Sequence, residues 1–120
     1  AKINALNPNL IIEFHCNASA ALTAGGTETL YSGSVKGKPI AATLQTAMLN
    51  VFGLKDRGIK ALDKNERGST LIFKTNAPCF IVEPFFISNE KEETIAVAKK
   101  DAYIKTMATT IEQIVAKGLV

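Results

Sequence analysis

A short apolar segment that ends in a carboxylate and a proline constrains the fold of this chain most. Residues 79–82 read Cys-Phe-Ile-Val, a composition typical of a buried β-strand, and Glu83 and Pro84 follow at once. Because proline has no N–H to continue a strand ladder, the strand should end there. Side chains at the ends of buried strands often form the functional site of α/β folds. Glu83 is therefore either a carboxylate of the functional site or a solvated residue at the rim of the sheet.

A second apolar segment, residues 10–15, has the same design and carries the only histidine of the chain, His15, at its carboxyl end. Because side chains alternate across a strand, Glu13, His15 and Asn17 should point to one face and Cys16 to the other. A histidine in this position is a candidate metal ligand or acid–base group. A lone histidine is also often a hydrogen-bonded structural residue, so both interpretations stay open.

Turn residues and apolar periodicity predict the remaining elements. We expect strands at 27–31 and 70–73, loops at 17–26 and 56–68, and helices at 38–54, at 90–99 and from Asp101, as the cap, to Gly118. The glutamates at the start of the helix at 90–99, Glu90, Glu92 and Glu93, are expected to be solvated. Strands that alternate with helices predict an α/β fold with a twisted, mainly parallel or mixed sheet flanked by helices.

Length and charge exclude several classes of protein. A chain of 120 residues suits one domain, and 47% apolar with 21% charged residues indicates a globular protein. The net charge of +3 suits an anionic polymer. It is too small to indicate nucleic acid, and no cluster of basic and aromatic residues supports such a partner. No apolar run is long enough to span a membrane, and the sequence shows no signal peptide, which a mature chain or a fragment could equally have lost.

The two cysteines, Cys16 and Cys79, do not have the spacing of a metal site. Both are flanked by apolar strand residues, which favours buried free thiols. The two expected strands should lie near each other, so a disulfide between them stays open.

Four segments together are more specific than any one of them. They are residues 13–17 (Glu-Phe-His-Cys-Asn), 26–31 (Gly-Thr-Glu-Thr-Leu-Tyr), 56–60 (Asp-Arg-Gly-Ile-Lys) and 82–89 (Val-Glu-Pro-Phe-Phe-Ile-Ser-Asn). In order and spacing they resemble the motifs of the zinc-dependent N-acetylmuramoyl-L-alanine amidases, which cut peptidoglycan. The resemblance implies a twisted sheet flanked by helices, with a zinc site at the strand ends.

The same resemblance implies roles for His15 as a zinc ligand and for Glu83 as the catalytic base. The family's other two ligands, a histidine and a glutamate, lie upstream on a segment that this chain does not contain. We therefore expect residues 1–120 to be the carboxyl-terminal part of an amidase catalytic domain. An upstream segment, joined to the chain or separate, would then supply the two missing ligands. A non-catalytic relative is the other explanation.

Some residues depart from the family pattern or have several interpretations. Glu13 stands where the family has a serine, and on the same strand face it could accept a hydrogen bond from the imidazole of His15. Arg57 and Asn17 are candidate substrate-binding residues. Arg57 could meet a carboxylate of the stem peptide, and Asn17 shapes a motif loop, although an ordinary surface arginine and a turn residue are the simpler interpretations. Glu28 is expected to be structural.

The sequence thus predicts a zinc hydrolase that cuts the amide bond between N-acetylmuramic acid and L-alanine in peptidoglycan. Such an enzyme works in the cell wall, in the periplasm or outside the cell, as an autolysin or a phage endolysin. A non-catalytic, amidase-like module that binds the wall or has a structural role is the alternative. A zinc carboxypeptidase acting on wall peptides is a third interpretation. The preferred stem peptide and the oligomeric state stay undetermined.

Overall fold

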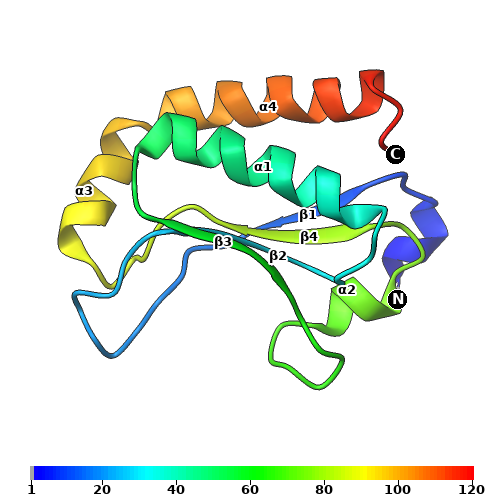
Figure 1. The fold of residues 1–120 in the computed structure, drawn as a ribbon, viewed down its shortest axis with the longest axis horizontal. Helices are drawn as coiled ribbons and strands as arrows, with labels where there is room; N and C mark the ends of the chain where they lie inside the picture. The colour runs from blue at the N-terminus through cyan, green and yellow to red at the C-terminus, as the bar shows by residue number, and fades with distance from the viewer. Residues whose placement is uncertain (1) are drawn as a thin grey trace.

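A four-stranded mixed sheet with helices on both faces forms the protein in a computed structural model that describes residues 2–120 (Figure 1). The elements are the 3₁₀ helix η1 (Lys2–Leu6), β1 (Ile11–Phe14), β2 (Thr27–Tyr31), α1 (Gly37–Phe52), β3 (Asp56–Ala61), α2 (Thr70–Lys74), β4 (Cys79–Glu83), α3 (Glu90–Ala98) and α4 (Lys100–Ala116). This architecture confirms the predicted α/β fold with a mixed sheet.

The strand order β1-β4-β2-β3 fixes which strand ends meet. Strands β1 and β4 are parallel, β2 and β3 are parallel, and β2 runs antiparallel to β4. The carboxyl ends of β1 and β4 therefore lie at the same end of the sheet as the amino ends of β2 and β3.

The two faces of the sheet are covered by different helices (Figure 1). Helices α1 and α4 lie together on one face, where they form the main core with apolar side chains of β2 and β4. Helix α2 and η1 lie on the opposite face, against Ile11, Cys79 and Ile81. Because side chains alternate along a strand, Glu13 and Glu83 continue this second face beyond its apolar residues. The second face is thus apolar at one end of the sheet and polar at the other.

The predicted helices are present, with small differences at their ends. Helix α1 buries one apolar stripe and ends at Gly53, which has the left-handed conformation (φ 62°) that favours glycine. Asn89 caps α3 by accepting the N–H of Glu92. The prediction that Asp101 caps the last helix is wrong, because α4 begins one residue earlier and places Asp101 in its first turn. Among residues 2–120, no helix combines the length and the apolar character needed to cross a membrane.

Two predicted elements are wrong. The segment expected to be a strand, 70–73, is the helix α2, because a run of three apolar residues does not distinguish a strand from a helical turn. The first part of the expected loop, 56–68, is the strand β3. Strand β3 is an edge strand with no buried residue and with Gly58 at φ 81°, so it lacks the apolar alternation that identifies most strands.

The two cysteines are free thiols in different environments. Cys79 is buried as predicted, and burial, with the charge of Glu13, raises its pKa to about 11. The prediction that Cys16 is buried is wrong, since it is exposed beyond the end of β1.

Candidate functional site

The end of β1 presents a histidine and a carboxylate to the polar end of the sheet. The Nε2 atom of His15 lies 3.0 Å from Oε2 of Glu13, with 46% and 21% of their side chains exposed. The two side chains share a strand face, as alternation predicts. Glu13 can therefore fix the orientation of the imidazole and leave the other ring nitrogen free.

The end of β4 places Glu83 opposite a second glutamate. Glu83 and Glu28 are direct partners in the antiparallel pair of β4 and β2, so their side chains lie on the same face. Burial contributes most to raising the pKa of Glu83 to about 7, followed by the hydrogen bond and the negative charge of Glu28. A carboxyl group that takes up a proton near neutral pH is suited to acid–base work.

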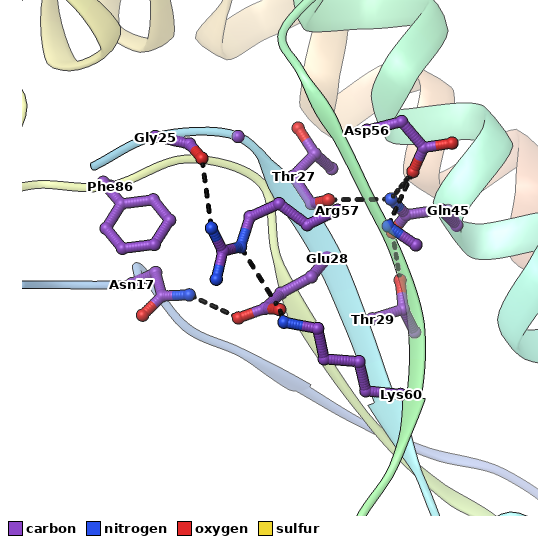
Figure 2. A network of polar contacts seen from close by, with 12 residues as sticks. Asn17, Gly25, Thr27, Glu28, Thr29, Gln45, Asp56, Arg57, Lys60 and Phe86 are labelled. Carbon is purple, nitrogen blue, oxygen red and sulfur yellow. Dashed lines mark hydrogen bonds and ion pairs between the residues drawn. The ribbon is translucent and has the colours of Figure 1, made fainter. Parts of the chain in front are cut away.

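Glu28 is held by three donors (Figure 2). Its carboxylate forms an ion pair with Lys60, lies 3.4 Å from Nε of Arg57 and accepts a hydrogen bond of 2.5 Å from Nδ2 of Asn17. Burial alone would raise the pKa of this carboxyl, but the hydrogen bond and charge of Lys60, with the charge of Arg57, outweigh burial and lower it. Glu28 therefore stays ionised, with only 7% of its side chain exposed.

Arg57 and Asn17 are built into this network. Arg57 lies on β3, half-buried, with its guanidinium 5.0 Å from the centre of the Phe86 ring and its Nη1 atom 3.5 Å from the carbonyl of Gly25. Asn17 extends the pairing of β1 and β4 through an isolated bridge to Phe86. Arg57 therefore lies on a strand and not on the expected loop, and its part in substrate binding stays a prediction.

A buried glutamine supports the network from the other face of β2 (Figure 2). Gln45 of α1 accepts the Thr29 hydroxyl at 2.9 Å and donates to the Thr27 carbonyl and to Oδ1 of Asp56, both at 2.8 Å. Because Gln45 joins β2 to β3, it fixes the strand positions from which Glu28 and Arg57 project.

Glu92 holds together the two loops beside the site. Its carboxylate accepts the backbone N–H of Gly26 at 2.8 Å and of Phe86 at 2.9 Å, and the residue is 8% exposed. The prediction that Glu92 is solvated is wrong. The close approach of the Glu92 carboxylate also explains the glycine at position 25, because a Cβ atom there would overlap the carboxylate.

Sequence reasoning missed the parts that Lys60, Gln45 and Glu92 take in this site. Lys60 had no local signal, because strand alternation places residues three apart, such as Arg57 and Lys60, on opposite faces. Glu92 had a local signal, since it stands three residues after the capping Asn89, the spacing of a capping box.

The described residues do not form a metal site by themselves. Within residues 2–120, no group of three or more His, Cys, Asp or Glu side chains is arranged to hold a metal ion. His15 can supply one imidazole nitrogen from an exposed surface. A catalytic zinc usually needs three protein ligands, so a zinc site at His15 would need ligands from another segment.

Replacing Glu83 with glutamine should raise the free energy of unfolding at neutral pH. The folded protein holds the pKa of Glu83 at about 7, above the ordinary value of 4.5, so folding opposes its ionisation. The stability contributed by the protonated form is complete below pH 4.5 and is lost as the pH rises toward 7. Glutamine stays neutral throughout. Because Glu83 is only half-buried, water screens the effect, and we expect a gain of about 1 kcal/mol.

Urea unfolding of the parental chain and of Glu83→Gln on either side of this pH range tests the expectation. The variant should be the more stable protein at about pH 8, and the difference should disappear at about pH 4. An equal difference at both pH values would mean that Glu83 titrates normally in the folded chain.

Comparisons with known proteins agree on one family. The family model of N-acetylmuramoyl-L-alanine amidase matches residues 1–117. No curated protein sequence matches the chain at a significant level.

Among solved structures, the chain is similar to a protein described as an N-acetylmuramoyl-L-alanine amidase from Neisseria meningitidis, with 30% identity and a TM-score of 0.79 over 96% of this chain. It is also similar to the catalytic domain of the amidase CwlV from Bacillus (Paenibacillus) polymyxa var. colistinus, with 28% identity and a TM-score of 0.74 over 98% of this chain. The catalytic domain of the endolysin CD27L, which targets Clostridia difficile, shares 26% identity and a TM-score of 0.77 over 93%. The chain spans 62%, 62% and 58% of these three structures, respectively.

Proposed function

This chain belongs to the N-acetylmuramoyl-L-alanine amidase family, and on that premise we propose that it takes part in zinc-dependent hydrolysis of the amide bond between N-acetylmuramic acid and L-alanine in peptidoglycan. The observation that carries the proposal is the meeting of His15 and the proton-accepting Glu83 at one end of the sheet. The substrate places the protein at the cell wall, in the periplasm or outside the cell, either as an enzyme that remodels the wall or as a phage lysin.

Glu83 acts as the proton carrier in this proposal. As a carboxylate it takes a proton from the attacking water, and as an acid it returns the proton to the departing amine. Its half-buried position and the pKa of about 7 support both roles, because each protonation state is accessible near neutral pH.

His15 is the zinc ligand that this chain contributes, and Glu13 orients its imidazole through the hydrogen bond of 3.0 Å. A bound zinc ion would supply Lewis-acid polarisation of the amide carbonyl and acidify water. Since residues 2–120 hold no complete metal site, we propose that an upstream segment, covalently joined or separate, provides a histidine and a glutamate. Residues 1–120 then form the carboxyl-terminal part of the catalytic domain.

The exposed edge of the sheet at β1 supports the proposal of an upstream segment. Among the described residues, strand β1 is paired on one side only, by β4, although its apolar sequence is typical of an interior strand. Phe14, which is 54% exposed, lines a groove of about 290 Å³ with apolar residues of α4. The hydroxyl of Tyr103, in the same groove, is buried without a hydrogen-bond partner among the described residues. A strand added to β1 with an apolar helix over the groove would cover all of these features.

Arg57 and Asn17 are the proposed substrate-binding residues. Both lie beside the Glu28 and Glu83 pair, and the guanidinium of Arg57 keeps donors that Glu28 and Gly25 do not use. A planar guanidinium binds carboxylates well, so a carboxylate of the stem peptide is the expected partner.

Zinc content and intact mass, measured on one purified sample, test the proposal. We expect about one zinc ion per complex when the sample contains the upstream segment, and little zinc in the 120-residue chain alone. His15→Ala should remove most of the zinc from the complex, whereas the exposed Glu112→Gln should retain it. A complex that contains the upstream segment but binds no zinc would contradict the proposed function.

A further inference from the structure

Strand β3 contains a bulge that turns Arg57 toward Glu28. The register of β2 and β3 shifts between Thr27 and Glu28, which leaves Arg57 as the extra residue of β3. Gly58, the partner of Glu28, has a φ of 81°, in the left-handed region that favours glycine, and its N–H donates to Oδ1 of Asp56 at 2.8 Å. A bulge redirects a side chain at the cost of regular pairing, and bulges are frequent next to functional sites.

The bulge brings two cations to one face of the sheet (Figure 2). Residues three apart on a regular strand face opposite sides, yet Arg57 and Lys60 both contact Oε2 of Glu28. The other carboxylate oxygen, Oε1, accepts a hydrogen bond from Asn17. One cation would neutralise this buried carboxylate, so the second leaves a net positive charge on the three charged side chains.

The two cations are more accessible to solvent than the carboxylate that holds them. The side chain of Glu28 is 7% exposed, whereas those of Arg57 and Lys60 are 29% and 44% exposed. A lysine ammonium has three N–H donors, and within residues 2–120 Glu28 is the one partner of Lys60. Neutralisation of Glu28 therefore does not use all of these donors, and an anion from solvent could accept the remaining ones.

The position of these cations relative to Glu83 indicates which part of the substrate they reach. Strand β2 lies between β4 and β3, and Lys60 on β3 reaches back to Glu28 on β2. A ligand of Lys60 and Arg57 therefore lies between one and two strand spacings, about 5–10 Å, from the end of β4. An extended peptide covers such a distance in about two residues. If Glu83 acts on the amide at the first residue of the stem peptide, the cations reach the second residue.

On the premise of the proposed function, we propose that Lys60 is a specificity-determining residue, which together with Arg57 binds a free carboxylate on the second residue of the stem peptide. Glu28 and the bulge in β3 position the two cations for this contact. A carboxylate offers two charged oxygens to the ammonium and the guanidinium, whereas an amide carries no charge and presents an NH₂ group in place of one oxygen. The enzyme therefore prefers stem peptides with a carboxylate at this position over those with an amide.

Two muramoyl peptides that differ only at that group, one with the free carboxylate and one with its amide, test the proposal. By titration calorimetry, the zinc-loaded Glu83→Gln enzyme, which should not turn the peptides over, should bind the carboxylate form about tenfold more tightly than the amide. Adding Lys60→Met to this enzyme should reduce the ratio of the two dissociation constants to about threefold or less, and Lys60→Arg should restore most of it. Lys117→Met, which removes an exposed lysine just after α4, should keep the full ratio.

Equal or undetectable binding of the two peptides by the Glu83→Gln enzyme would overturn the inference, and so would a ratio that Lys60→Met leaves unchanged. A merely structural role for Lys60 would weaken the binding of both peptides equally and keep the ratio. Hydrolysis tests the proposed function separately. A parental enzyme that is loaded with zinc but cuts neither the muramoyl peptides nor peptidoglycan would contradict the proposed function, whatever the ratio of dissociation constants, so the two failures are distinguishable.

Discussion

Amide hydrolysis by the zinc-loaded enzyme should fall by roughly 10²- to 10⁴-fold when Glu83 is replaced by glutamine, because the reaction then loses its proton carrier. Glutamine has almost the same volume and keeps the position at the end of β4, so the fold should be retained. Zinc content should also be retained, since Glu83 is not among the proposed ligands. The rate of peptide release from purified peptidoglycan, with zinc measured on the same samples, checks the prediction.

Glu112→Gln is a matched control for this experiment, because it makes the same chemical change on the exposed side of α4. It should release peptides at the parental rate. If Glu83→Gln also cuts walls at the parental rate, the assignment of Glu83 as the catalytic base is wrong. A variant that loses zinc and activity together would instead indicate that Glu83 binds the metal.

Much of the fold could be predicted because the interior strands carry unambiguous patterns. The apolar runs of β1 and β4 and the periodic stripe of α1 all bury side chains on defined faces, and burial of apolar surface dominates local preference. Helix α2 and strand β3 were mistaken for other structures because neither has such a pattern. One is five residues long, and the other has no buried residue.

The site could be predicted only in part, for a physical reason. His15 and Glu83 stand out because each follows an apolar strand and belongs to a recognisable motif. The partners of Glu28 depend instead on the register of three strands, which no local pattern specifies. The antiparallel pairing of β2 with β4 is what places Glu28 opposite Glu83. The sequence alone could therefore name the proton carrier but not the carboxylate beside it.

The largest effect on stability is expected at Glu92, a residue that composition alone would assign to the solvated start of a helix. Its carboxylate accepts two backbone N–H groups, from Gly26 and Phe86, and it is 8% exposed. Glutamine can accept one of these hydrogen bonds, but its amide NH₂ group would face the other N–H. Because a buried donor left without a partner is costly, we expect Glu92→Gln to lower the free energy of unfolding by about 2–3 kcal/mol.

Glu93→Gln provides the control, since Glu93 is exposed on the same first turn of α3 and the change removes the same charge near the helix start. Chemical denaturation should show a loss of less than about 0.5 kcal/mol for this variant. Hydrogen exchange should locate the loss in Glu92→Gln, with faster exchange at the Gly26 and Phe86 amides. Equal losses in the two variants would mean that the helix dipole, and not the two hydrogen bonds accepted by Glu92, accounts for the effect. These hydrogen bonds would then have no part in holding the two loops beside Glu83.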